Sequence, residues 1–247
     1  MAGGKDTLTL CEEIRSKYSP CDISDALLTL GVPGAGFLKD IKPIPSRSQG
    51  TNRIVAPIST VLFVPKQQRP VFPLWNQSKP WESNIPKGKH WTDCPAPGAI
   101  VVLQQPPEQS VALLGDIVAT RLKYRGVLGV VIDGRARDVV SCGELCNEGG
   151  FQVWSKALSS VGTGMEAKPW AVDVPLTIGG LTVKPGDIVC ADEGEGVVCV
   201  IPRDKLQQVV ELLPVLKRAD DGVLADVRKG VDFATALRNH PEHYSNK

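Results

Sequence analysis

The sequence predicts a single α/β domain, and three observations lead to that prediction. Residues 99–134 contain two short apolar runs, an amphipathic stretch and a third apolar run, which is the order of a βαβ-like unit. Further apolar runs of strand length, separated by glycines, follow between residues 151 and 203. From Asp204 to about Arg238 the periodicity becomes that of an amphipathic helix. The chain of 247 residues is long enough to bury one sizeable core.

Two helices are expected before the first strand. Residues 7–17, TLTLCEEIRSK, have helical periodicity, and residues 21–31, CDISDALLTLG, form a second candidate. Asp22 or Ser24 could cap the second helix, because both side chains accept hydrogen bonds from free backbone N–H groups. Gly31 is the expected end, since glycine readily adopts the backbone conformation that terminates helices.

A strand at residues 56–65, APISTVLFVP, leads into an unusual segment at residues 65–98. That segment holds seven prolines, and this density of proline blocks regular helices and strands. It also holds three of the five tryptophans, Trp75, Trp81 and Trp91, whereas disordered segments are usually poor in aromatic residues. We therefore expect an ordered insertion that either covers a site as a lid or contacts another subunit.

The second half of the chain has the clearer pattern. Strands are expected at AIVVLQ, SVALL, VLGVVIDG, FQVWS, VPLTIGGLTV, GDIVCAD and GVVCVIPR, with one helix at GDIVATRLKYRG between the second and third. Residues 204–247 are expected to form C-terminal helices and a tail, with Pro214 and Gly222 as breaks. Because the sequence contains no internal repeat and no low-complexity tract, residues 1–247 are predicted to be one domain.

Composition and charge exclude several classes of protein. Hydrophobic residues make up 42% of the chain and charged residues 22%, as in ordinary globular proteins. The net charge of +1 provides no field that would attract nucleic acid or an anionic membrane. No apolar run is long enough to span a bilayer, and the N-terminus lacks the apolar core of a signal peptide. The seven cysteines are an odd number without a tight framework, so reduced thiols and a cytoplasmic location are expected.

Charged residues follow the most apolar strand of the chain. The run GVVIDGRARD begins with buried-type residues and ends in Arg137 and Asp138. Charge at the end of a buried strand is costly unless something binds it. Gly115 and Asp116 stand where the preceding strand turns into a helix, whose free N–H groups attract anions. In a βαβ unit the carboxyl ends of both strands lie together, so Asp116, Arg137 and Asp138 are expected to meet.

The residue types of this cluster allow two interpretations. Arg137 presents a planar fork that suits a carboxylate, Asp138 can hold a hard divalent cation, and Asp116 can orient a water or move a proton. The alternative is structural: an Asp–Arg ion pair closes the turn, and Asp116 caps the helix. Spacing alone does not decide between the two interpretations.

The same segment resembles a known protein family. VALLGDIVATRLKYRGVLGVVIDGRARD is similar to the signature of proteins related to regulator of RNase E activity A, which include the class II 4-hydroxy-4-methyl-2-oxoglutarate aldolases. Aldolase members carry an aspartate, twenty residues and then Arg–Asp, which correspond here to Asp116, Arg137 and Asp138. The resemblance continues in ISDALLTLG, in DCPAPGAIVVLQ and in IGGLTVKPGDIVCADEGEGVVCVIPRDKL. It therefore covers most of the chain, except the proline-rich insertion and the ends.

The resemblance implies a layered β/β/α fold of the swivelling phosphohistidine-domain type, assembled as a homotrimer or homohexamer with sites between subunits. It implies that Asp138 ligates Mg²⁺ or Mn²⁺ and that Arg137 holds a small 2-oxo acid. Backbone amides around Leu114, Gly115 and Asp116 would receive the substrate carboxylate, and Asp116 would orient the water that transfers protons.

The implied activity is that of a metal-dependent lyase. Retro-aldol cleavage of a 4-hydroxy-4-methyl-2-oxoglutarate-type substrate and decarboxylation of oxaloacetate both leave pyruvate enolate, which a divalent cation and an arginine can stabilise. Two alternatives stay open. One is a non-catalytic binding protein that regulates a ribonuclease, as the family's namesake does, and the other is a lyase with a bulkier substrate. The intact Asp116, Arg137 and Asp138 favour chemistry.

Three positions depart from the family pattern. Several members carry an acidic residue three positions after the second aspartate, where this chain has Ser141. The acidic turn ADEGEGVV is one residue longer than usual, and either Glu193 or Glu195 is a candidate ligand for the metal of a partner subunit. Arg135 occupies a slot that is often filled by a small residue, where it would bind substrate or pair with an acid.

Overall fold

The structure is a computed structural model that describes residues 6–44, 52–67 and 82–246. The strands of the main sheet are β1 (Lys42–Pro43), β2 (Arg53–Pro65), β3 (Ile100–Gln104), β4 (Ala112–Leu114), β5 (Gly129–Ala136), β6 (Gln152–Leu158), β7 (Ala167–Val172), β10 (Ile188–Asp192) and β11 (Val197–Ile201). Their order is β1-β6-β5-β3-β2-β10-β11, with β4 beside β5 and β7 beside β2. Two further strands, β8 (Leu176–Ile178) and β9 (Leu181–Val183), form a separate hairpin.

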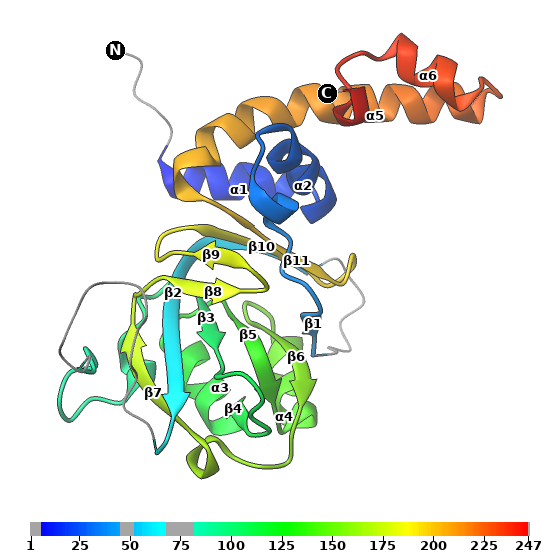
Figure 1. Ribbon diagram of the computed structural model, residues 1–247. Helices are drawn as coiled ribbons and strands as arrows, with labels where there is room; N and C mark the ends of the chain where they lie inside the picture. Colours follow the sequence, from blue (N-terminus) through cyan, green and yellow to red (C-terminus); the bar gives the residue numbers. More distant parts are fainter. Residues whose placement is uncertain (1–5, 45–51, 68–81, 247) are drawn as a thin grey trace.

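The long strand β2 joins two β layers, as its curved course in Figure 1 shows. Its first residues, 53–57, pair antiparallel with β10, and residues 58–62 pair parallel with β3. At the other end of the order, the segment that leads into β1 returns to β11, where the backbone N–H of Leu38 donates to the Val198 carbonyl at 3.0 Å. The sheet therefore curls until its two edges nearly meet, which forms a nearly closed barrel.

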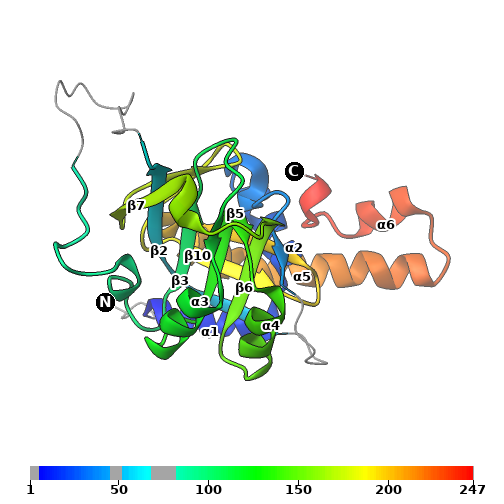
Figure 2. The same ribbon diagram turned by 90° about the horizontal axis from the view of Figure 1, so that it is seen from below.

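Helices cover the outside of both layers (Figures 1 and 2). They are α1 (Thr7–Lys17), α2 (Pro20–Thr29), α3 (Asp116–Tyr124), α4 (Val139–Asn147), α5 (Leu206–Arg228) and α6 (Phe233–Asn239). Helices α3 and α4 pack on the parallel strands β3, β5 and β6, while α1, α2 and α5 pack on β10 and β11. The layered α/β fold with a helical C-terminal part that the sequence predicts is confirmed.

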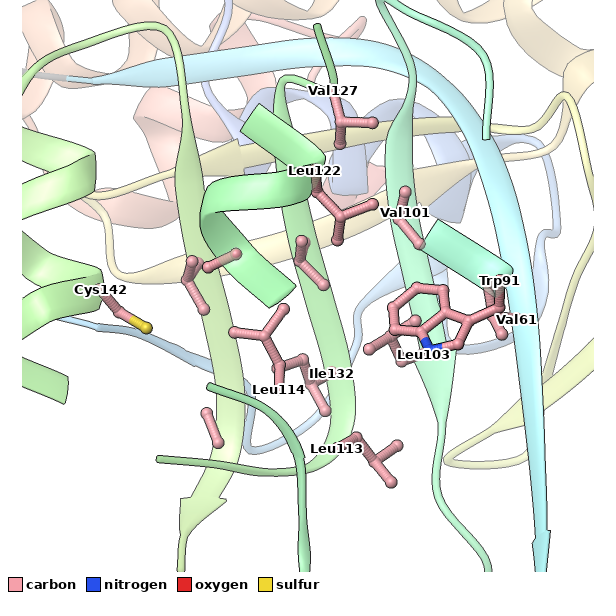
Figure 3. Packing of buried hydrophobic residues seen from close by; sticks show 14 of the residues in the cluster. Val61, Trp91, Val101, Leu103, Leu113, Leu114, Leu122, Val127, Ile132 and Cys142 are labelled. Carbon is pink, nitrogen blue, oxygen red and sulfur yellow. The ribbon is translucent and has the colours of Figure 1, made fainter. Parts of the chain in front are cut away.

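The parallel strands are buried on both faces. Val101 and Leu103 of β3 point toward α3, whereas Ile100 and Val102 point into the barrel. Both faces of these strands thus lose contact with water, which explains their unbroken apolar runs. Figure 3 shows the side facing α3, where Leu122 of that helix lies over the sheet.

Trp91 belongs to this core. It lies in a short 3-10 helix, Trp91–Asp93, is 3% exposed, and is drawn with the other residues of this cluster in Figure 3. Its ring meets that of Phe63 edge to face, with 5.6 Å between the ring centroids. The insertion therefore contributes one core residue to the domain. Trp75 and Trp81 lie outside the described residues, so the choice between lid and subunit contact stays a prediction for that segment.

The first two helices form where the sequence indicates, but the expected cap of the second is wrong. Helix α2 begins at Pro20, one residue before the predicted start, and Ser19 is its N-cap. The Ser19 hydroxyl accepts from the Asp22 N–H at 3.2 Å, while the Asp22 carboxylate accepts from the Ser19 N–H at 2.7 Å. Asp22 thus completes a capping box three residues into the motif. Gly31, at a φ of 67°, follows the helix end as expected.

Helix α5 contradicts the predicted breaks at Pro214 and Gly222, because it runs unbroken through both. Its apolar stripe, which includes Leu213 and Leu216, is buried against the first two helices, and this burial offsets the hydrogen bond that Pro214 cannot make. At Gly222 the missing side chain has a packing role, since an added Cβ would lie 2.3 Å from the His240 ring. The chain breaks instead near Gly230, at a φ of 87°.

Two further expectations can be compared with the structure. Within the three described ranges, no helix combines the length and the apolar character that crossing a membrane requires. All seven cysteines are free thiols, as predicted. Five of them, Cys11, Cys142, Cys146, Cys190 and Cys199, are buried and act as small apolar residues.

Candidate active site

The start of helix α3 lies beside the end of strand β5. Strand β4 pairs parallel with β5 through Leu114 and Ala136, and the backbone N–H of Arg137 donates to the Leu114 carbonyl at 2.9 Å. Gly115 is the N-cap of α3 and makes no side-chain capping bond, so the first N–H groups of the helix point out of the turn. The predicted meeting of the two strand ends is therefore present.

Asp138 turns back toward this helix start. Its backbone is left-handed, with φ 54° and ψ 46°, an uncommon conformation for a residue other than glycine. The Asp138 carboxylate accepts from the Asp116 N–H at 3.3 Å and lies 3.3 Å from the Arg137 Nε. Asp116 uses one carboxylate oxygen to accept from the Ile117 N–H at 2.7 Å. The Asp138 conformation thus aims its carboxylate at the Asp116 N–H and the Arg137 guanidinium.

Two glycines leave the space that this arrangement needs. A Cβ on Gly115 would lie 2.4 Å from the Asp138 Oδ2 and 3.0 Å from the Arg137 Nε. A Cβ on Gly162, in the loop after β6, would lie 3.2 Å from an Arg137 guanidinium nitrogen. Gly162 could not be identified from the sequence, because it lies far from the motif along the chain and carries no side chain to mark it. The close approach of its backbone confines the Arg137 head group.

The structural interpretation, an ion pair that closes the turn, accounts for only part of this geometry. The Arg137 and Asp138 side chains are 41% and 37% exposed, and their contact of 3.3 Å is long for a charge-assisted hydrogen bond. Exposed pairs of this kind contribute little to stability. Among the described residues, no other contact engages the Arg137 guanidinium as donor. The cluster therefore presents a guanidinium and two carboxylates to solvent at the start of a helix.

Cys142 lies directly beneath the cluster and is chemically inert there. Its thiol contacts the Arg137 carbonyl at 3.6 Å. Burial raises the pKa of Cys142 to about 12, and the charges of Cys146, Asp138 and Asp116 add to that increase. The thiol therefore stays protonated at neutral pH, which makes it a poor nucleophile.

The donor set suits a hard, hydrated cation. The structure holds no group of three or more His, Cys, Asp or Glu side chains that could bind a metal within the described part of the chain. Mg²⁺ rarely needs such a group, since it commonly binds through one or two carboxylates and keeps several waters. Asp138, with Asp116 beside it, fits that kind of open site.

The acidic turn between β10 and β11 lies far from Asp138 in the same chain. Asp192 pairs with Arg53, and the Glu193 N–H donates to the Asn52 carbonyl, so the turn lies at the amino ends of the parallel strands. Strand β5 has eight residues, which places its two ends roughly 23 Å apart. Neither Glu193 nor Glu195 therefore reaches Asp138 within one chain. Ser141 lies in α4, close to the cluster.

Exposed apolar side chains surround the cluster. Ile117 beside Asp116 is 79% exposed, and Val140 in the first turn of α4 is 74% exposed. Leu158 and Met165, which flank Gly162, are 54% and 56% exposed. Exposed apolar side chains beside a polar site are typical of surfaces that bind other proteins.

Comparison with protein families gives one match over most of the chain. The family described as RraA-like, Aldolase/RraA, matches residues 20–199. That range includes the start of α3, the end of β5 and the acidic turn.

Two curated proteins are similar in sequence. "Protein DlpA" of Legionella pneumophila is 25% identical over 219 residues, which are 89% of this chain and 32% of that protein. A protein of Halalkalibacterium halodurans, provisionally named 4-hydroxy-4-methyl-2-oxoglutarate aldolase, is 28% identical over 126 residues, which are 51% of this chain and 56% of that protein. The matched regions thus span about a third of the first relative and about half of the second.

Two solved structures share the fold. An uncharacterized protein of Pseudomonas syringae pv. tomato aligns with a TM-score of 0.71 at 23% identity, over 95% of this chain and 99% of that one. RraAS2 of Streptomyces coelicolor, described as an unusual member of the RNase ES inhibitor RraA protein family, aligns with a TM-score of 0.68 at 23% identity. That alignment covers 91% of this chain and 100% of the other, so the likeness establishes the fold over nearly the whole length.

Proposed function

Because the chain belongs to the RraA-like family, we propose that it is a divalent-metal-dependent carbon–carbon lyase that acts on small 2-oxo acids. The reactions are retro-aldol cleavage of 4-hydroxy-4-methyl-2-oxoglutarate-type substrates and decarboxylation of oxaloacetate. One observation supports this proposal above the others. The helix start at Asp116 and the Arg137–Asp138 pair meet at an exposed edge, held open by two glycines.

Asp138 is the residue that would hold Mg²⁺ or Mn²⁺, with Asp116 within reach of the waters around the ion. When bound, the cation would supply a Lewis acid that stabilises negative charge developing on the keto oxygen of the substrate. The carboxylate of Asp138 is partly exposed and aimed toward the helix start, which leaves room on its open side for an ion and its waters.

The other groups act on the 2-oxo acid itself. The backbone amides around Leu114, Gly115 and Asp116 bind the substrate carboxylate, aided by the positive end of α3, and the substrate replaces Asp138 as the acceptor for the Asp116 N–H. Arg137 places its guanidinium beside the keto oxygen, where it stabilises the enolate left by bond cleavage. Asp116 orients a water that carries a proton to or from the reacting carbon and hydroxyl.

A shared site between subunits is part of the proposal. The apolar side chains of Ile117, Val140, Leu158 and Met165 would be covered by a second copy of the chain in a homotrimer or homohexamer. Glu193 or Glu195 of the partner subunit would then supply a carboxylate that the same chain cannot provide.

The test is pyruvate release from oxaloacetate and from 4-hydroxy-4-methyl-2-oxoglutarate, with Mn²⁺, with Mg²⁺ and with EDTA. We expect metal-dependent pyruvate above the metal-only background, and a loss of at least about 100-fold in Arg137→Ala. Asp138→Asn should weaken Mn²⁺ binding by at least tenfold, as measured by titration calorimetry. The matched control is Glu148→Gln, which removes a carboxylate from the exposed pair with Lys123 at the far end of α4.

Full activity in Asp138→Asn, or equal Mn²⁺ affinity in Asp138→Asn and the control, would refute the assignment of the metal site. Metal binding without pyruvate release from either substrate would favour one of the alternative functions instead: a lyase with a bulkier substrate, or a regulatory binding protein.

A further inference from the structure

A polar cavity of about 390 Å³ lies at the same edge of the parallel strands as the candidate active site. The ends of β3, β5 and β6 form it together with the loop at residues 105–109 and one residue of β8. Its polar lining includes Gln104, Gln105, Asp133, Arg135, Lys156 and Thr177. A cavity of this size can enclose a small organic acid.

Arg135 is held in place within this cavity. Its backbone N–H donates to the Gln105 Oε1 at 2.8 Å, and one guanidinium nitrogen donates to the Leu158 carbonyl at 2.9 Å. No carboxylate pairs with Arg135 among the described residues, so it does not form the acid pair that the sequence left open. A guanidinium has five N–H donors, and most of these remain available to a ligand.

The neighbouring charges leave Arg135 as the cation available to an anion. Lys156 forms an ion pair with Asp133, and these two charges cancel within the lining. Gln104 is also engaged, since its amide makes both hydrogen bonds to the backbone of Thr177. Glu108 is exposed on the loop, where solvent screens it. A planar, tethered guanidinium in a cavity suits a carboxylate.

The two arginines of the strand end are close neighbours. Arg135 and Arg137 are separated by one residue, so their Cα atoms are roughly 7 Å apart. The end of β6 contacts Arg135 through the Leu158 carbonyl, and the loop that follows contacts Arg137 through the backbone of Gly162. A ligand with two carboxylates can therefore engage both regions of this edge.

We propose that this cavity is a carboxylate subsite with Arg135 as its anchor. The carboxylate has two possible sources. One is the far carboxylate of a dicarboxylic 4-hydroxy-2-oxo acid whose keto end lies at Arg137, a source that rests on the proposed function. The other is a separate small carboxylic acid that binds beside the active site. The chemistry at Arg135 is the same in both cases.

The first experiment measures binding and needs no turnover. Titration calorimetry with Mn²⁺ present compares 2-oxoglutarate, pyruvate and glutarate for the wild type, Arg135→Gln and Arg228→Gln. Arg228 is exposed at the end of α5, so the control removes one positive charge far from the cavity. We expect Arg135→Gln to weaken binding of the two diacids roughly 10- to 100-fold and to leave pyruvate unchanged.

Competition between the ligands and the number bound per chain identify the source of the carboxylate. If 2-oxoglutarate displaces pyruvate and binds once per chain, the carboxylate is the far end of the substrate. If glutarate and pyruvate bind to the same chain at the same time, the carboxylate at Arg135 belongs to a separate ligand. In the first case the kcat/KM for 4-hydroxy-4-methyl-2-oxoglutarate should fall in Arg135→Gln, while that for the monocarboxylic 4-hydroxy-2-oxopentanoate should not.

Two further variants separate a lost contact from a damaged fold. Arg135→Lys keeps the charge but not the fork, and it should bind the diacids with intermediate affinity. Thr177→Trp fills the cavity from an exposed position whose side chain makes no hydrogen bond to any described residue. It should block the diacids while the melting temperature stays unchanged.

Equal diacid affinity in the wild type and in Arg135→Gln, including no measurable binding by either, would overturn this subsite. Failure of the proposed function looks different: no pyruvate is released from any substrate, yet the diacids still bind in an Arg135-dependent way.

Discussion

Replacement of Gly115 by alanine should disable the candidate site without unfolding the protein. The backbone at Gly115, with φ −131°, suits alanine, so the substitution introduces no conformational strain. The new Cβ would lie 2.4 Å from the Asp138 Oδ2 and 3.0 Å from the Arg137 Nε. Both side chains must therefore move away from their present positions.

The size of the effect follows from that clash. Ordinary contact begins near 3.4 Å, so the Asp138 carboxylate has to retreat by about 1 Å. A displacement of that size at a reacting group lowers a rate by roughly 100-fold. The cost in unfolding free energy should stay near 1 kcal/mol or below, because both side chains are more than a third exposed and can rotate into solvent.

The assays are Mn²⁺ affinity, kcat for metal-dependent pyruvate release and the thermal midpoint of unfolding. Gly164→Ala is the matched control, since an added Cβ there lies within 4 Å of no described neighbour. We expect Gly115→Ala to lose metal affinity and activity at a nearly unchanged melting temperature, while Gly164→Ala keeps all three. Wild-type metal affinity and activity in Gly115→Ala would show that the convergence of Gly115, Arg137 and Asp138 is not what the site depends on.

Three predictions concern the stability of the folded protein, and chemical or thermal denaturation measures each of them. Trp91→Ala should cost about 3–5 kcal/mol, because the ring is buried against Phe63; a loss under 1 kcal/mol would place it outside the core. Ser19→Ala should cost about 1 kcal/mol through loss of the capping box, and an unchanged midpoint would contradict the role of that cap. Burial, with Asp220 and Asp22 nearby, raises the pKa of Asp25 to about 6, and His243 opposes that increase. The folded protein thus holds the Asp25 proton more tightly than the unfolded chain, so this group lowers stability as pH rises from about 4 through 6. Asp25→Asn should then stabilise the protein at pH 7.5 by about 1 kcal/mol, a value reduced for solvent screening, and should have little effect near pH 4. A variant that is less stable than the wild type at pH 7.5 would show that the folded protein does not raise the pKa of Asp25.

Apolar periodicity and turn residues determine the local elements. The two strands and the helix of the βαβ unit form where their patterns predict, because both faces of the parallel strands are buried and leave continuous apolar runs. The same unit places Asp116, Arg137 and Asp138 at one edge, since a parallel crossover returns the second strand beside the first. This part of the site could be predicted from spacing alone.

Local rules failed where distant packing competes with them. Pro214 and Gly222 are helix breakers by propensity, yet α5 continues through both, because its apolar stripe is buried and the His240 ring occupies the space at Gly222. Strand β7 and helix α4 were not predicted. Strand β7 depends on pairing with β2, more than a hundred residues earlier in the chain.

Residues far apart in sequence decide the details of the candidate site. The sequence by itself determined that an arginine and two aspartates gather at a sheet edge. Only the tertiary structure brought Gly162 against Arg137 and separated the acidic turn of Glu193 from Asp138. It also left Arg135 in a cavity with no acid partner in the described part of the chain. The physical reason is the distance along the chain over which each effect acts. Periodicity reflects the local backbone conformation, whereas the space around a side chain, its burial and its charge partners depend on segments that meet only after the chain has folded.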